Sequence, residues 1–309
     1  MRILVLRLGA LGDFVLSFGA FAAIRAHHSI AHVTLLTTAP FADLAERAPW
    51  FDAVLVDRRA PLWNLPGLWR LRRQLRGFDL VYDLQTSARS AAYFALAGRP
   101  AWSGVARGCS LPHANPGRDA MHTLERQREQ LAMAGIPHFP EPDLGWLTRT
   151  APTLDLPPRY ALLVPGAAPH RPAKRWPAER FAELARHLAG RGLVPVILGT
   201  SREAPLAAAI RARCPEALDL MGRTTLADMA SLAAGAAVAV GNDTGPMHLA
   251  AAVGCPCVAL FSAASDPALT APRGPGGAWP RVLRVPSLVA LTVDCLLYTS
   301  DAADDLTRV

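Results

Sequence analysis

The chain has 309 residues, half of them apolar, which is enough for two domains of ordinary size. No uncharged apolar run approaches 18 residues, which argues against a membrane-spanning helix. The chain starts directly with a strand-like segment and shows no signal peptide, so we expect a cytoplasmic protein. A net charge of +7 favours an acidic partner: a nucleotide, a nucleic acid or an anionic lipid surface.

Nearly all of the positive charge is arginine, because the sequence holds 31 arginines and a single lysine, Lys174. A compact ammonium group in a chain that otherwise uses the planar arginine fork suggests a specific role. Chance survival of one surface lysine would give the same composition. The five cysteines show neither a CxxC motif nor paired metal-ligand spacing, so we expect free thiols and no metal site.

The first segment predicts a strand over residues 2–6, a turn with the sequence Gly9-Ala10-Leu11-Gly12-Asp13, and a helix over residues 14–27. The turn reads GxxG and not GxGxxG, and the next strand, residues 31–37, ends in threonines where a ribose-binding acid would stand. Both features disfavour a nicotinamide dinucleotide. We therefore interpret the turn as one that presents Asp13 as a functional carboxylate; the alternative is a helix N-cap.

The rest of the first half alternates strand and helix signals, with strands predicted over residues 53–56 and 80–84 and helices over residues 40–48, 65–76, 87–96 and 122–134. The helix over residues 65–76 is basic and amphipathic. It either packs on a core with a solvated arginine face or lies against an anionic membrane surface. Six prolines within residues 137–158 predict a linker, so the expected domains are residues 1–150 and 151–294.

The second half repeats the alternation, with strands predicted over residues 160–164, 193–198, 218–221, 238–240 and 257–261 and helices over residues 177–190, 204–214 and 226–234. Its most informative stretch follows residue 240 and reads Gly241-Asn242-Asp243-Thr244-Gly245-Pro246. Asp243 or Thr244 can cap the next helix, and Gly245 lets a ligand approach the backbone. Free amides and the positive end of a helix would then meet at one point, which suits a phosphate. An ordinary capped β–α loop is the alternative.

Alternating strands and helices in both halves predict an α/β protein with two Rossmann-like parallel-sheet domains. Ligands are expected at the carboxyl ends of the strands, facing a central cleft. Residues 295–309 depart from the arginine-, alanine- and proline-rich style of the chain and resemble a translated sequencing-library adapter. We therefore expect a non-native read-through tail after Asp294.

Four motifs resemble those of glycosyltransferase family 9, the ADP-heptose:lipopolysaccharide heptosyltransferases. They are Arg7-Leu8-Gly9-Ala10-Leu11-Gly12-Asp13, Tyr82-Asp83-Leu84-Gln85, Lys174-Arg175-Trp176-Pro177, and Asn242-Asp243-Thr244-Gly245-Pro246-Met247-His248-Leu249. They span nearly the whole chain in the family's order. The resemblance implies a GT-B fold in which domain 1–150 binds the acceptor and domain 151–294 binds the nucleotide sugar.

The resemblance also implies an activity: inverting, metal-independent transfer of heptose from ADP-heptose to an anionic glycolipid acceptor, the lipopolysaccharide core. No cofactor and no nucleic acid is expected. The enzyme would be cytoplasmic, with peripheral contact with the inner face of the inner membrane as an option. Asp13 matches the family's general base, which takes the proton of the acceptor hydroxyl. One carboxylate base opposite the leaving group implies direct displacement with inversion.

The remaining expected site residues bind the two substrates. Lys174 and the amides of Thr244 and Gly245 would stabilise the leaving diphosphate. Asp219 matches an acidic position that binds ribose hydroxyls in relatives. His248 either contacts the nucleotide or packs its helix, and Asp243 either contacts the ligand or orients the turn. Gly9, Gly12 and Gln85 belong to the acceptor-side loops.

Two other functions fit the same motifs. A relative with another nucleotide sugar or acceptor would use the same chemistry. A non-catalytic nucleotide-sugar-binding protein would not need both Asp13 and Lys174, so their presence argues against it. A nicotinamide dehydrogenase is disfavoured by the missing glycine motif.

Overall fold

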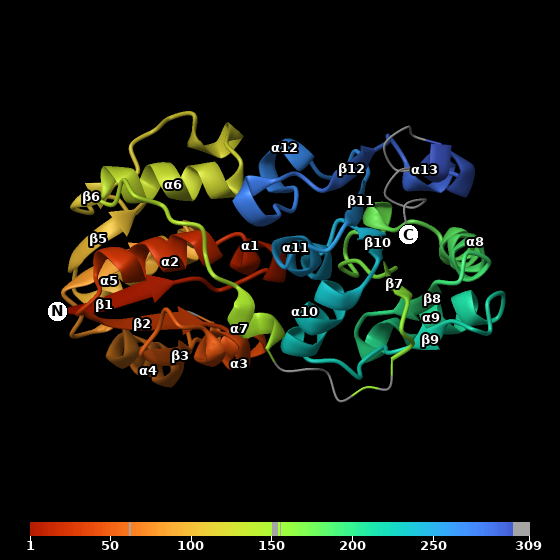
Figure 1. The fold of residues 1–309 in the computed structure, drawn as a ribbon. Helices are drawn as coiled ribbons and strands as arrows, with labels where there is room; N and C mark the ends of the chain where they lie inside the picture. Colours follow the sequence, from red (N-terminus) through yellow and green to blue (C-terminus); the bar gives the residue numbers. More distant parts are fainter. Residues whose placement is uncertain (62, 150–153, 155, 299–309) are drawn as a thin grey trace. The chain divides into compact units, whose positions relative to one another are not determined.

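A computed structural model describes residues 1–61, 63–149, 154 and 156–298 of the chain. The chain divides into two compact units, unit 1 over Met1–Trp146 and unit 2 over Leu147–Val309. Each unit contains a parallel sheet covered by helices (Figure 1). The predicted α/β class with two parallel-sheet domains is therefore confirmed.

Within the described residues, the sheet of unit 1 has the strand order β3-β2-β1-β4-β5-β6. Residues Ile3 to Leu6 are fully buried, because helices cover both faces of a parallel sheet. The register pairs Leu4 with both Thr34 and Val81. The strands are β1 (Arg2–Leu6), β2 (His32–Thr37), β3 (Ala53–Val56), β4 (Leu80–Asp83), β5 (Ala101–Gly104) and β6 (Leu111–Pro112).

The helices of unit 1 follow the predicted segments with one important difference. They are α1 (Leu11–Val15), α2 (Phe18–His27), α3 (Ala39–Arg47), α4 (Leu65–Leu75), α5 (Ala88–Ala97), the 3₁₀ turn η1 (Arg118–Ala120) and α6 (Thr123–Met133). The short helix α7 (Gly145–Thr148) spans the division between the two units in the sequence. The single helix predicted over residues 14–27 is wrong, because α1 and α2 replace it.

The break between α1 and α2 has a local cause. The carbonyl oxygen of Asp13 accepts bonds from the Arg7 guanidinium and from the Ser17 hydroxyl. The Ser17 amide, which would continue the helix by bonding to that carbonyl, bonds to Phe14 instead. A serine that bonds back to the carbonyl four residues earlier is known to bend helices. Helix α1 starts at Leu11, so Asp13 lies in its first turn.

The sheet of unit 2 has the order β12-β11-β10-β7-β8-β9 among the described residues. Its strands are β7 (Tyr160–Val164), β8 (Val194–Ile197), β9 (Leu218–Asp219), β10 (Val238–Asn242), β11 (Cys257–Phe261) and β12 (Arg281–Arg284). Its helices are α8 (Ala178–Ala189), α9 (Ala204–Arg211), α10 (Leu226–Gly235), α11 (Gly245–Ala252), α12 (Pro267–Thr270) and α13 (Val293–Tyr298), with 3₁₀ turns η2 (Pro172–Lys174), η3 (Ser201–Glu203), η4 (Pro275–Gly277) and η5 (Leu288–Ala290).

Two differences from the expected elements of the sheets have physical reasons. The strand predicted over residues 218–221 ends at Asp219, because the Asp219 carboxylate accepts the amide of Met221 and turns the chain. Strands β5, β6 and β12 were not predicted, since they are two to four residues long and lie toward sheet edges, where the hydrophobic pattern is weak. Neither difference changes the order of the central strands.

Two further findings concern the membrane and the end of the chain. Within the part of the chain that the structure describes, no helix has the length and apolarity to cross a bilayer. Helix α13 contains residues of the expected tail, and Leu296 is fully buried in the core of unit 2. Residues 299–309 of that expected tail lie outside the described residues.

Candidate functional site

The expected site residues fall into two groups, one at the carboxyl end of the strands of each unit. Asp13, Gly9, Gly12 and Gln85 belong to unit 1, and the group around Lys174 belongs to unit 2. Each group is described on its own.

Asp13 combines a fixed backbone with an accessible carboxylate. Arg7 follows strand β1 and is buried, and its Nε and Nη2 donate to the Asp13 carbonyl at 3.1 and 2.9 Å. Its Nη1 donates to the carbonyl of Leu84, which follows β4. The same guanidinium lies 3.3 Å from the Asp13 carboxylate, whose side chain is 38% exposed. Arg7 thus ties two strand ends to the backbone that carries Asp13.

A second buried layer supports this arrangement. The Ser17 hydroxyl donates to the Asp13 carbonyl at 2.7 Å and accepts from the Gln127 amide of α6 at 2.9 Å. Burial lowers the pKa of the Arg7 guanidinium, and the opposite charge of Asp13 acts against that shift. Arg126, also on α6, has a pKa lowered by burial and by Arg118, again with Asp13 acting against the shift. Asp13 is therefore a carboxylate in a locally cationic setting.

Gly9 and Gln85 shape the turns beside Asp13, whereas Gly12 lies within α1. A Cβ on Gly9 would lie 2.7 Å from the Phe41 ring, and the φ of Gly9 is +120°, so this position requires glycine. Gly12 is buried inside α1. The Gln85 side-chain oxygen accepts the amide of Leu8 at 2.8 Å and so joins the turn after β4 to the turn after β1.

Asp83 holds the turn that carries Gln85. It is the last residue of β4, is fully buried, and its Oδ1 accepts the amides of Gln85 and Thr86 at 3.1 and 3.0 Å. Burial raises the pKa of its carboxyl to about 6, although these hydrogen bonds and the Arg7 charge act in the opposite direction. Asp83 therefore positions the Gln85 turn and is not accessible to a substrate.

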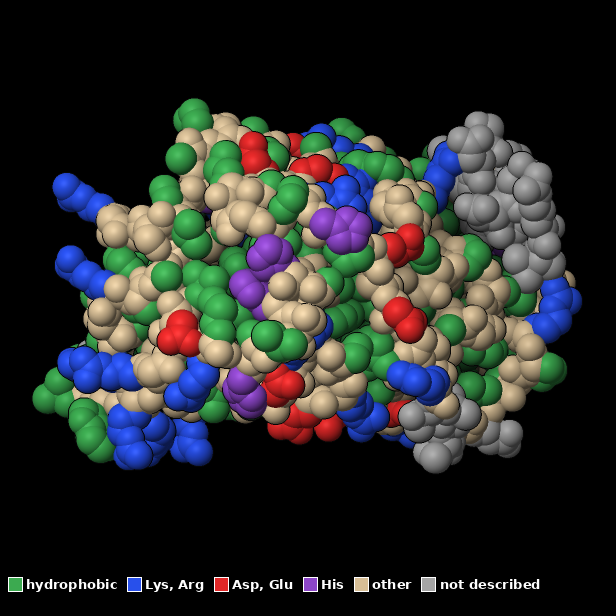
Figure 2. Space-filling view, turned by 60° about the vertical axis from the view of Figure 1, so that its left-hand side comes forward, with side chains coloured by type: hydrophobic (Ala, Val, Ile, Leu, Met, Phe, Trp, Pro, Cys, Tyr) green, Lys and Arg blue, Asp and Glu red, His purple; other side chains and the backbone are tan. Residues whose placement is uncertain are grey.

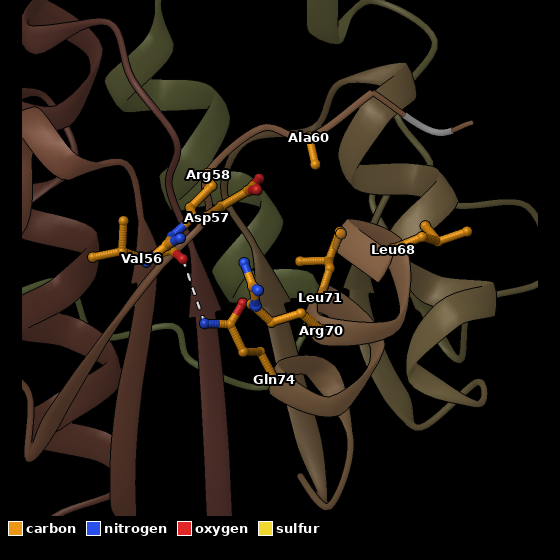
Figure 3. Close-up of a pocket in the computed structure, with 9 residues that line it drawn as sticks. Val56, Asp57, Arg58, Ala60, Leu68, Arg70, Leu71 and Gln74 are labelled. Atoms are coloured by element: carbon orange, nitrogen blue, oxygen red, sulfur yellow. Dashed lines mark hydrogen bonds between the residues drawn. The ribbon is translucent and has the colours of Figure 1, made fainter. Parts of the chain in front are cut away.

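A basic region and a shallow pocket adjoin the end of β3. The buried Asp57 carboxylate accepts the Tyr93 hydroxyl and the Arg59 amide, and Arg89 lies 3.9 Å away. The pocket is lined by residues of the β3–α4 connection and of α4, among them Arg58 and Arg70. Figure 3 shows Gln74 of α4 bonded to the carbonyl of Val56 across it. Arg58 and Arg70 line this small pocket together with the Asp57 carboxylate and several apolar side chains.

In unit 2 the structure brings Lys174 and Asp243 together. Lys174 ends η2, Asp243 follows β10, and the Lys174 ammonium forms an ion pair with the Asp243 carboxylate at 2.5 Å. The side chains are only 12% and 7% exposed. The only lysine of the sequence is therefore held beside the turn that was predicted as a phosphate site.

Asn242 explains how this turn is built. It is fully buried, its Oδ1 accepts the Trp176 amide at 2.9 Å, and its Nδ2 donates to the carbonyls of Pro165 and Gly166. One side chain thus joins the end of β10, the loop after β7 and the loop that carries Lys174. Gly241 allows the close packing behind it, since a Cβ there would lie 2.6 Å from the Val164 side chain.

Thr244 and Gly245 form the start of α11 and are partly exposed, as is Pro246 after them. Thr244 occupies the N-cap position, but its hydroxyl bonds to the Asn242 carbonyl and makes no side-chain cap. The prediction that Asp243 or Thr244 caps this helix is therefore confirmed in position for Thr244, but neither side chain makes a capping hydrogen bond, because both have other partners. His248 lies further along α11 and is buried.

Asp219 and Glu203 are the two acids near the neighbouring strand ends. Asp219 lies on the outer strand β9, half-buried, where its carboxylate accepts the Met221 amide at 2.9 Å. Glu203 follows β8, one strand closer to β7, and its Oε2 accepts the amide and hydroxyl of Thr200. Its Oε1 packs so closely on Gly166 that a Cβ added to this glycine would lie only 1.9 Å from it. Glu203 thus lies directly over the loop that Asn242 holds.

Sequence reasoning missed the roles of Arg7, Asn242 and Glu203. Arg7 and Asn242 stood within the recognised motifs, and a polar residue that directly follows or ends a buried strand was an available signal. Glu203 completes a Thr-x-x-Glu capping box after the second strand of the unit, which was also readable. Among the described residues, no three His, Cys, Asp or Glu side chains form a group that could hold a metal ion.

Comparison with known proteins identifies a family and several relatives. Residues 68–276 match glycosyltransferase family 9 (heptosyltransferase). The lipopolysaccharide heptosyltransferase 1 of Pseudomonas aeruginosa is 29% identical over 89% of this chain and 82% of its own length. The lipopolysaccharide heptosyltransferase 2 of Salmonella typhimurium is 28% identical over 88% of this chain and 85% of its own length.

Comparison with solved structures supports the fold. The structure of the Escherichia coli ADP-heptose lipopolysaccharide heptosyltransferase II is similar over 100% of this chain and 99% of that one, with a TM-score of 0.78 and 24% sequence identity. The likeness is one of fold and includes both parallel-sheet units.

Proposed function

This chain belongs to glycosyltransferase family 9 and is a glycosyltransferase, and we propose that it transfers heptose from ADP-heptose to a lipopolysaccharide core acceptor with inversion at the anomeric carbon. The observation that carries the proposal is Asp13. Its backbone is fixed by three hydrogen bonds from buried side chains, while its carboxylate stays accessible. Relatives named as heptosyltransferases supply the choice of sugar.

In the proposed reaction, Asp13 is the general base. It accepts the proton of the acceptor hydroxyl while that oxygen attacks the anomeric carbon, and the bond from this carbon to the diphosphate breaks. A base held within hydrogen-bond reach contributes about 10²–10⁴ to the rate. Arg7 is a positioning residue, because it touches the backbone and one carboxylate oxygen of Asp13. One displacement with one carboxylate base inverts the configuration.

The diphosphate of the donor is proposed to lie at the start of α11. Lys174 and the amides of Thr244 and Gly245 would take up the negative charge that grows as the sugar leaves. Asp243 holds the ammonium in place before the donor binds, since it pairs with Lys174. The protein supplies this charge without a metal ion, so the transfer rate should be the same with and without a chelator.

The ribose of the donor is proposed to bind Glu203 in preference to Asp219. A carboxylate after the second strand of a Rossmann-like unit is the usual partner of ribose hydroxyls. Glu203 follows β8, and its Oε1 lies against Gly166 next to the segment that Asn242 holds. Asp219 is one strand further out. His248 is either a packing residue of α11 or a donor contact.

The acceptor is proposed to bind unit 1, where Gly9 and Gln85 shape the turns beside Asp13, Gly12 lies next to Asp13 in α1, and arginines line the pocket at the end of β3. Because a lipopolysaccharide core is built on a lipid, the enzyme would work at the inner face of the inner membrane.

Thermal unfolding with a panel of nucleotides tests the donor site. ADP and ADP-heptose should raise the melting temperature more than UDP, GDP or NAD. The variant Glu203→Gln should lose most of that shift, whereas the matched variant Asp219→Asn should keep it. Stabilisation by UDP or GDP alone would mean another nucleotide sugar, and stabilisation by NAD alone would contradict a glycosyl donor site. Loss of the ADP shift only in Asp219→Asn would assign the ribose to Asp219.

A further inference from the structure

Helix α4 and the residue before its N-cap expose large apolar side chains to solvent. The exposed fractions are 84% for Trp63, 72% for Leu65 and 62% for Trp69. Eight large hydrophobic side chains are exposed among the described residues, and three of them lie within these seven positions. We call the surface formed by these three residues with Arg70, Arg72, Arg73 and Arg76 the α4 face.

The α4 face is the outer side of a helix that is already packed. Leu71 and Leu75 are buried and belong to the core of unit 1. Leu65 and Trp69 lie four residues apart and therefore on one side of the helix, away from that core side. Asn64 caps the helix by accepting the Gly67 amide at 3.0 Å. The exposed apolar residues are therefore not needed to hold α4 on its unit.

Positive charge is concentrated on the same segment. Residues 58–78 contain six arginines and no carboxylate, whereas unit 1 as a whole contains sixteen arginines and twelve carboxylates. The remainder of unit 1 is therefore slightly acidic, and the whole positive excess of unit 1 lies in residues 58–78. Figure 2 shows Lys and Arg side chains gathered with hydrophobic side chains at the lower left of the surface.

These arginines keep their charge available. In the part of the chain that the structure describes, no carboxylate lies within 4.0 Å of the guanidinium groups of the α4 face. Asp57, which lines the adjoining pocket (Figure 3), accepts the Tyr93 hydroxyl and lies 3.9 Å from Arg89. Arg73 stacks on the Trp69 ring at 4.9 Å. The tryptophan is thus presented together with a cation.

We propose that the α4 face docks on the surface of a bilayer that contains anionic lipids. Tryptophan prefers the headgroup level of a membrane, and arginines beside it pair with lipid phosphates. A basic helix with an apolar strip lies in the plane of the interface. The inference rests on the proposed function in that a lipid-linked acceptor requires such a surface, but vesicle binding tests it without any transfer reaction.

The charge of the segment decides between occupants. A second copy of this chain would place the four arginines of one α4 face against the four of the other, and like charges oppose that contact. A water-soluble acidic partner would account for the arginines, but the exposed tryptophans would have no role. An anionic bilayer uses both groups.

The test is co-sedimentation of the full chain with two kinds of vesicle. One contains phosphatidylcholine alone, and the other contains phosphatidylcholine with about 30% phosphatidylglycerol as the anionic lipid. We expect binding to the anionic vesicles only, weakened by salt. Trp63→Ser/Trp69→Ser should lower the partition coefficient about tenfold, whereas the matched pair Ile30→Ser/Val289→Ser, also exposed, should not.

A second pair of variants isolates charge. Arg72→Gln/Arg76→Gln should weaken vesicle binding about 25-fold, since each arginine near an anionic surface contributes about fivefold. The control Arg211→Gln/Arg213→Gln removes the same charge from unit 2 and should have much less effect. Equal losses in both pairs, or binding that ignores the tryptophans, would overturn the proposal. A change of oligomeric state in Trp63→Ser/Trp69→Ser would assign the surface to a second copy and also overturn it.

Failure here is separable from failure of the proposed function. Trp63→Ser/Trp69→Ser should transfer sugar to a detergent-dispersed acceptor at the wild-type rate and to a vesicle-embedded acceptor several-fold more slowly. Wild-type rates on both acceptors would overturn the docking surface while leaving the transferase activity in place.

Discussion

Replacement of Arg7 by lysine tests whether the Asp13 backbone must be held by a planar fork. Lysine keeps the positive charge but has one ammonium in place of three directed N–H groups. Arg7 donates to the Asp13 carbonyl through Nε and Nη2 and to the Leu84 carbonyl through Nη1. A single ammonium in Arg7→Lys can keep only some of these bonds. The ends of β1 and β4 would then no longer be joined through this side chain.

The expected size follows from these bonds. A hydrogen bond from a charged donor contributes about 1.5–3 kcal/mol, and a buried carbonyl left without a partner costs about 1–3 kcal/mol. Ser17 still donates to the Asp13 carbonyl, so the main loss is at Leu84. We expect Arg7→Lys to lower the free energy of unfolding by about 2–4 kcal/mol. A shift of Asp13 of about 1 Å would lower kcat by about 10².

Arg25 provides the matched control. Its guanidinium also donates to two carbonyls, those of Trp50 and Ala31, and to the Asp52 carboxylate. Urea unfolding and kcat at saturating donor should be measured for Arg7→Lys and Arg25→Lys. Both should lose stability, but only Arg7→Lys should lose kcat. Equal kcat values in the two variants would refute the positioning role of Arg7.

Three further predictions concern other contacts. Lys174→Ala should lower kcat by about 10²–10³ in a transfer assay. It also leaves the Asp243 carboxylate buried without its partner, which should lower the free energy of unfolding by about 3–5 kcal/mol in urea unfolding. The double variant Lys174→Ala/Asp243→Asn should regain stability but keep the low kcat. The Asp83 pKa is raised to about 6, so the folded state binds this proton more tightly than the unfolded state, and stability falls as the pH rises from 4 to 8. Relative to Asp83→Asn, the wild type should lose about 2–3 kcal/mol over this range, and parallel pH curves would contradict the raised pKa. Gly241→Ala would place a Cβ 2.6 Å from Val164 and should lower stability by about 1–3 kcal/mol, measured by thermal unfolding; an unchanged melting temperature would show that the strand adapts.

The sequence allowed the central strands and the fold class to be predicted because buried parallel strands leave long apolar runs. Residues 3–6 and 257–261 are such runs, and both lie in strands of the structure. The short strand β6 has two residues and no pattern, so only its pairing with β5 identifies it. The break between α1 and α2 depends on Arg7 and Ser17 meeting at one carbonyl, which helical periodicity does not encode.

The candidate site shows the same division. Asp13, Lys174 and the turn at Thr244 stood out because glycines, a unique lysine and a strand–turn–helix signal mark them in the sequence. The pairing of Lys174 with Asp243 joins residues 69 positions apart and could not be read from local pattern. Glu203 carries a local signal, but its contact with Gly166 is visible only when β7 and β8 are side by side.

The most direct test of the central claim is acceptor-dependent ADP release from ADP-heptose by the wild type and by Asp13→Ala. The proposed function predicts that the wild type releases ADP only when a lipopolysaccharide core acceptor is present, and that Asp13→Ala is slower by about 10²–10⁴ with an unchanged melting shift on ADP binding. Wild-type turnover in Asp13→Ala would contradict the assignment of the base, and no acceptor-dependent release by the wild type would contradict the proposed donor and acceptor.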